Sequence, residues 1–73
     1  MKYPSLREVE KANQVQLGRW MRFLASPGFD CVGKPNFEDI LAGEKLILST
    51  IIERFERGGD WTPELSKQVG WET

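Results

Sequence analysis

The sequence contains no histidine and a single cysteine, Cys31, and these absences exclude most catalytic and metal-binding chemistry. A Ser-His-Asp or Cys-His pair cannot be assembled without histidine, and a structural zinc site needs about four Cys or His ligands. A lone cysteine forms no disulfide within the chain, so we expect Cys31 to be a small, partly buried hydrophobic residue in a reducing compartment. We therefore predict that the protein is not an enzyme and has no metal site and no cofactor.

Long hydrophobic runs are missing as well. Lys2 is followed by polar sequence rather than by the apolar segment of a signal peptide, and no window approaches the roughly 18 consecutive apolar residues of a membrane span. Ten basic residues oppose eleven acidic ones, giving a net charge of −1, which does not favour general binding to nucleic acid or anionic membranes. With 40% hydrophobic residues in 73, the chain is expected to be one folded, cytosolic domain, residues 1–73.

The apolar spacing predicts an all-α fold, a small bundle of two main helices plus a short C-terminal helix. A Ser-Leu-Arg-Glu capping box at residues 5–8 marks the first helix start. Two interpretations then compete. One is a single helix over residues 6–25, and the other is two helices, 6–12 and 14–25, separated by a turn at Asn13. Apolar residues that stay near one face favour the single helix.

Residues 26–36 form a loop rich in Pro and Gly, and its apolar residues are expected to tuck under the core: Phe29, Cys31 and Val32. Asn36 is predicted to cap a second helix, whose pattern is strongest over residues 44–57. The segment 37–42 is either part of that helix or a separate turn, because Ala-Gly follows it. Gly58 is expected to end the helix in a left-handed conformation.

The C-terminal segment predicts a last helix over residues 63–69, with Thr62 as its N-cap and Gly70 as its stop. Trp71 is expected to fold back onto this helix. The segment resembles the first half of a helix-turn-helix motif, but too few residues follow for a recognition helix. We therefore expect no sequence-specific DNA binding.

Two arginines three residues apart, Arg19 and Arg22, project from the same side of the predicted first helix. Together with the ring of Trp20 and the hydroxyl of Ser26, they could bind a phosphate and stack a base. This makes the four residues a candidate site for a nucleotide-like anion. The competing interpretation is that the arginines pair with acidic residues while Trp20 lies in the core.

The second long helix is apolar on more than one side, because Leu46 and Leu48 are about 200° apart at about 100° per residue. Such a helix needs cover on both sides, which predicts a dimer or larger homo-oligomer. Glu53 and Arg57 are spaced to form an ion pair at the rim. The residues proposed for the interface are Ile47, Leu48, Ile51 and Phe55.

Three stretches of the sequence resemble a group of small proteins of tailed bacteriophages that are usually labelled hypothetical. They are residues 3–12 (YPSLREVEKA), residues 16–28 (QLGRWMRFL followed by SPG) and residues 52–71 (IERF, then GGDWTPELSKQVGW). The resemblance implies a phage gene expressed in the cytoplasm of a host bacterium, and it assigns no role to any residue. Proteins of this kind act as accessory or anti-defence factors that bind a host protein or a signalling nucleotide, or serve as minor structural or assembly proteins of the virion.

Overall fold

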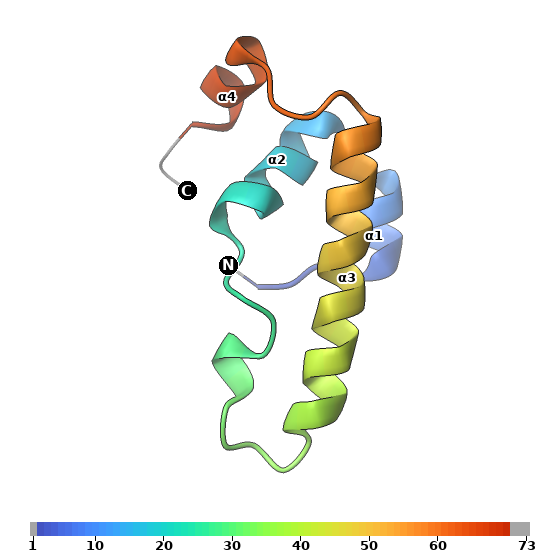
Figure 1. The fold of residues 1–73 in the computed structure, drawn as a ribbon, viewed down its shortest axis with the longest axis vertical. Coiled ribbons are helices and arrows are strands. Elements are labelled where there is room, and N and C mark those ends of the chain that lie inside the picture. Colours follow the sequence, from blue (N-terminus) through green and yellow to red (C-terminus); the bar gives the residue numbers. More distant parts are fainter. Residues whose placement is uncertain (1, 71–73) are drawn as a thin grey trace.

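The structure is a computed structural model that describes residues 2–70, and it confirms the all-α class (Figure 1). No strand is present among these residues. The elements follow in the order α1 (Leu6–Lys11), α2 (Gln14–Phe23), the 3₁₀ turn η1 (Phe29–Cys31), α3 (Phe37–Arg57) and α4 (Pro63–Val69).

The first helical region is two helices, so the prediction of one helix over residues 6–25 is wrong and its alternative is confirmed. Ala12 ends α1 in an extended conformation, with φ −72° and ψ 145°. The side-chain oxygen of Asn13 then accepts a hydrogen bond from the backbone N–H of Gln16, at 2.9 Å. An Asn side chain that caps a new helix competes with continuation of the old one, and the chain turns here.

The third helix, α3, runs without a break through Gly43 and covers 21 residues. The prediction of a left-handed Gly58 is wrong, because its φ is −82°. The positive φ angles belong instead to Gly59, at 116°, and Asp60, at 58°. Glycine at 58 serves close packing, since a Cβ there would collide with the side chain of Gln14.

The last helix, α4, matches its predicted bounds. The hydroxyl of Thr62 accepts from the backbone N–H of Leu65 at 3.0 Å, Pro63 occupies the first turn, and Gly70 ends the helix at φ 73°. The predicted fold-back of Trp71 lies outside the described residues.

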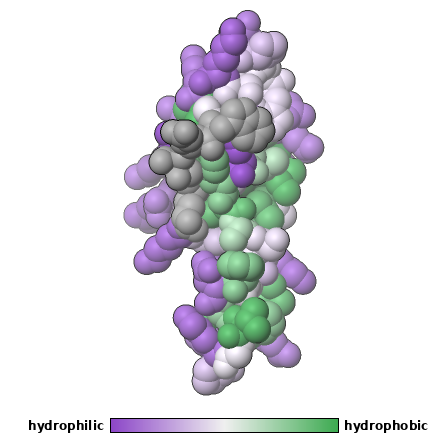
Figure 2. Space-filling model, turned by 90° about the vertical axis from the view of Figure 1, so that its left-hand side faces the viewer, coloured by the Kyte–Doolittle hydropathy of each residue, from purple (hydrophilic) through white to green (hydrophobic). Residues whose placement is uncertain are grey.

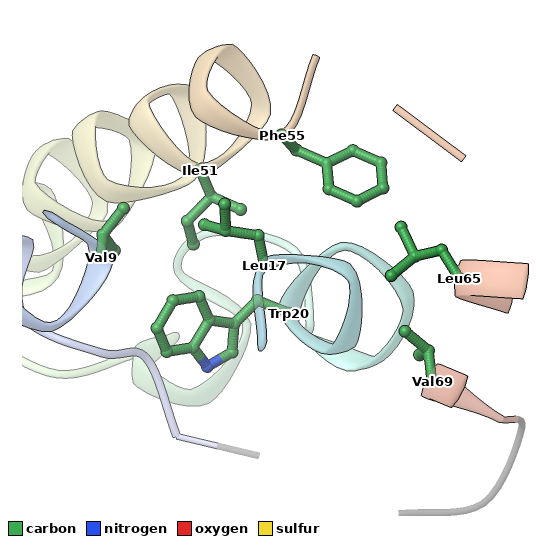
Figure 3. Close-up of a cluster of buried hydrophobic side chains, with 7 residues drawn as sticks. All are labelled: Val9, Leu17, Trp20, Ile51, Phe55, Leu65 and Val69. Carbon is green, nitrogen blue, oxygen red and sulfur yellow. The ribbon is translucent and has the colours of Figure 1, made fainter. Parts of the chain in front are cut away.

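The core gathers side chains from all four α-helices around the C-terminal half of α3 (Figure 3). Phe55 is fully buried, and the ring of Trp61 meets it edge to face, with centroids 4.9 Å apart. The buried cluster consists of Val9, Leu17, Trp20, Ile51, Phe55, Leu65 and Val69.

Long side chains tie the helices together by donating to carbonyls in the last turns of their neighbours. Arg54 of α3 donates to the carbonyl of Val9 in α1, and Gln14 of α2 donates to the carbonyl of Phe55 in α3 at 2.9 Å. Carbonyls in the last turn of a helix lack the regular partners of the helix interior, and these side chains add a donor to carbonyls that also accept from the backbone N–H groups of Ala12 and Asp60. We call these contacts, with a third one made by Arg22, the carbonyl clasps.

The molecule is elongated, with extents of 42 × 23 × 15 Å. Its radius of gyration is 12.9 Å, against about 11 Å for a compact chain of this length. The helices α1, α2 and α4 gather at one end of α3, and the loop with η1 runs beside the other end (Figure 1). We call residues 24–50, which form this second end, the arm.

Replacing either of two glycines within helices by alanine is expected to have opposite effects on stability. A Cβ on Gly18 would lie 2.9 Å from Cγ2 of Val69 and 3.4 Å from Phe55, so Gly18→Ala must push α4 away. Nothing lies within 4 Å of a Cβ on exposed Gly43. We expect Gly43→Ala to raise the free energy of unfolding by about 0.5–1 kcal/mol and Gly18→Ala to lower it by about 1–3 kcal/mol. Urea denaturation measures both, and a Gly18→Ala chain as stable as the wild type would contradict the packing of α4.

Candidate functional site

The side chain of Arg22 holds the end of α4. Its Nη1 donates to the carbonyls of Ser66, at 3.3 Å, and Gly70, at 2.6 Å, and Nη2 donates to the hydroxyl of Ser66 at 3.0 Å. The guanidinium also lies over the ring of Trp61, 4.3 Å from its centroid. A cation at a helix C-terminus is stabilised by the helix dipole. Arg22 therefore makes the third carbonyl clasp.

The other residues of the predicted anion site have different environments. Trp20 is 7% exposed and its ring lies in the core (Figure 3). Arg19 is half-buried and Ser26 is exposed. Two of the four residues, Arg22 and Trp20, are thus engaged in the packing of the chain itself, which weakens the case for an anion site built around them.

The predicted oligomer interface needs correction. Ile51 and Phe55 are fully buried in the chain's own core, so they present no surface to a second chain. Ile47 and Leu48 are half-buried on the arm. The predicted ion pair between Glu53 and Arg57 is confirmed on the exposed side of α3.

The arm exposes apolar side chains along α3. Between residues 37 and 50 no residue of this helix is buried. Leu46 is 55% exposed and the other large apolar side chains there are half-buried: Phe37, Ile40, Leu41, Ile47 and Leu48. Figure 2 shows the face on the loop side, where hydrophobic surface continues from the middle of the molecule to its lower end.

The loop of the arm carries the two most exposed large apolar side chains among the described residues, Phe29 at 69% and Val32 at 76%. The expectation that both tuck under the core is wrong, while that for Cys31, 4% exposed, is confirmed. The 3₁₀ turn accounts for the difference between Phe29 and Cys31, because consecutive residues of such a turn point in different directions, and Val32 follows the turn. The loose alternation of apolar residues in this loop does not indicate which of them is buried.

Three contacts fix this loop, and one of them joins it to α3. The backbone N–H of Gly28 donates to the carboxylate of Glu44 at 2.8 Å, and the thiol of Cys31 lies 3.4 Å from the carbonyl of Gly28. Gly28 has φ 81°, and a Cβ there would lie 2.9 Å from Cδ1 of Leu41, so only glycine fits. The loop is therefore held in one conformation by its own contacts.

The N-terminal segment adds the third contact. The hydroxyl of Tyr3 donates to the carbonyl of Ala25 at 2.6 Å. Burial raises the pKa of Tyr3, and the nearby carboxylate of Glu44 raises it further. The phenol thus stays protonated at neutral pH and keeps its role as donor.

A shallow concavity of about 520 Å³ adjoins this loop and is lined by residues 32–39. Its lining includes Lys34 with Glu38 and Asp39. No group of three or more potential metal ligands occurs among residues 2–70.

Comparison with models of protein families, with curated proteins and with solved structures finds no match for this chain. No helix in the described part of the chain is both long and apolar enough to cross a membrane.

Proposed function

We propose that the chain is a small non-enzymatic binding protein that docks on another protein through the arm. The observation that carries this proposal is the exposure of Phe29 and Val32 on a loop that is otherwise fixed. Exposed apolar clusters on small folded proteins mark interaction surfaces. A loop already held in one conformation loses little entropy on binding, which favours affinity.

A protein partner fits this surface better than a nucleotide. The guanidinium of Arg22, the group best suited to grip phosphate, is bonded to α4, whereas the arm offers aromatic and aliphatic side chains typical of protein interfaces. Together with the resemblance to small phage proteins, this favours an accessory factor that acts by occupying a protein surface in the cytoplasm of a host bacterium.

Photo-crosslinking in cells that produce the chain tests the proposal. A benzophenone amino acid replaces Phe29 or Val32, and, as controls, the exposed residues Glu10 in α1 and Lys67 in α4. We expect a protein adduct of defined mass from positions 29 and 32 only. The adduct from position 29 should fall at least about tenfold when Val32 is also changed to serine, because central apolar contacts dominate binding energy.

Two results would contradict the proposal. One is an equal yield of adducts from the control positions, which would indicate random collision. The other is the absence of any protein adduct from positions 29 and 32 in a chain whose circular dichroism shows native helix content.

A further inference from the structure

One side of α3 carries a line of residues with the spacing of a coiled-coil seam. Residues three and four positions apart alternate along a helix surface and form a continuous strip. The apolar members of this strip are half-buried and the charged members are exposed. The strip consists of Glu38, Leu41, Lys45, Leu48 and Ile52, and we call it the seam.

The charges of the seam have no partners in the described part of the chain. Glu38 and Lys45 are seven residues apart, about 10 Å along the helix axis, so they cannot pair with each other within one molecule. Neither makes a hydrogen bond or ion pair to any other residue between 2 and 70. A charged residue at a seam position specifies the register of helix pairing, at a cost in stability.

A second copy of the same helix, running in the opposite direction, satisfies both charges at once. In an antiparallel pair, positions equally distant from the two-fold axis meet. An axis passing midway between Leu41 and Ala42 therefore brings Glu38 opposite Lys45 of the second copy, and Lys45 opposite its Glu38. We propose, building on the function proposed above, that the protein docked on the arm is a second copy of this chain in this antiparallel register.

The same register accounts for the exposed loop. The loop runs beside the first turns of its own α3, because the N–H of Gly28 donates to Glu44 and a Cβ on Gly28 would lie 2.9 Å from Cδ1 of Leu41. In the antiparallel pair the loop therefore lies level with residues 39–46 of the second copy, where Leu46 is 55% exposed. The register thus places the exposed loop of each copy at the level of the exposed Leu46 of the other, symmetrically about the two-fold axis.

The available area fits a weak dimer. The broad face of the molecule measures 42 × 23 Å, and the half formed by the arm offers roughly 500 Å² per copy, or roughly 1000 Å² in total, at the lower limit for specific interfaces. The accessible surface is 5174 Å², against about 4600 Å² for a compact monomer of this mass. The difference between these two accessible surface areas is close to the area that one copy would bury in the dimer.

A charge-exchange cycle tests the register. Sedimentation equilibrium is measured on the purified wild-type chain at concentrations up to 500 µM, roughly a hundred times the micromolar dissociation constants of weak complexes. It should show a monomer–dimer equilibrium. Glu38→Lys and Lys45→Glu should each weaken the dimer about tenfold, because each places two like-charged pairs across the interface. The chain carrying both substitutions restores opposite charges and should dimerise within about twofold of the wild type.

Two matched controls make the same charge changes off the seam. Asp39→Lys lies about 100° further around the helix than Glu38, and Lys67→Glu lies on the exposed surface of α4, outside the arm. Both should leave the dimerisation constant within about twofold. Circular dichroism establishes that every variant is folded.

A wild-type chain that stays monomeric at the highest concentration would overturn the second copy as partner, and so would a double variant as weak as the single ones. Crosslinking from position 29 separates this failure from that of the proposed function. An adduct of twice the chain mass supports the dimer, whereas an adduct with a different protein, formed by a monomeric chain, leaves the docking function standing without the dimer.

Discussion

Replacing Phe55 with alanine is expected to lower the free energy of unfolding by about 3–5 kcal/mol. The ring of Phe55 is fully buried in the core cluster and meets the ring of Trp61 edge to face, and its removal leaves a cavity that the surrounding helices cannot fill. A chain of this length has a total stability of about 4–11 kcal/mol. The variant should therefore be partly or wholly unfolded at room temperature, as measured by helix content and by chemical denaturation.

Phe29→Ala is the matched control, because the same ring is removed from a side chain that is 69% exposed. We expect a change in stability below about 0.5 kcal/mol. A similar loss from both substitutions would mean that the loop belongs to the folding core, and the arm would then not be a docking surface.

Replacing Arg22 with alanine is expected to lower the free energy of unfolding by about 2–3 kcal/mol. The substitution removes three hydrogen bonds from a charged donor and the contact with the ring of Trp61, and hydrogen bonds to charged groups contribute about 1.5–3 kcal/mol. It also leaves the last carbonyls of α4 without that donor. Denaturation followed by tryptophan fluorescence measures the loss.

Arg19→Ala is the control for the neighbouring guanidinium. Arg19 lies half-buried on the same helix without a clasp, so its loss should cost less than about 1 kcal/mol. Arg22→Lys should recover part of the stability, because lysine keeps the charge but lacks the planar fork that reaches two acceptors. If both alanine substitutions had equally small effects on stability, neither arginine would hold the fold together. The two arginines would then again be candidates for an anion site on the surface.

Local signals in the sequence predicted the helix ends well. The capping box of Ser5 and Glu8 and the cap of Thr62 involve residues three positions apart, and such contacts form wherever the local pattern occurs. The break at Asn13 carries the same kind of signal, but the apolar face of Leu17 and Trp20 outweighed it in the prediction. That apolar face belongs to α2 only, because α2 packs into the core as a helix separate from α1.

Contacts between distant residues could not be predicted in this way. Arg22 meets Ser66 and Gly70 across 44 and 48 positions, and nothing in its immediate surroundings in the sequence distinguishes it from Arg19. The burial of Ile51 and Phe55 likewise depends on which side of α3 the other helices cover. The sequence showed that α3 was apolar on several sides, and only the fold decides which side remains open.

The carbonyl clasps have a consequence for how the chain acquires its structure. They join residues 41 to 48 positions apart, and contacts between such distant positions form slowly because a long loop must close first. The helices α1 and α4, with six and seven residues, are too short to persist without them. During synthesis on the ribosome, α1 and α2 can therefore be clasped to α3 once Phe55 has emerged, whereas α4 is held only after Gly70 has emerged and Arg22 can reach it.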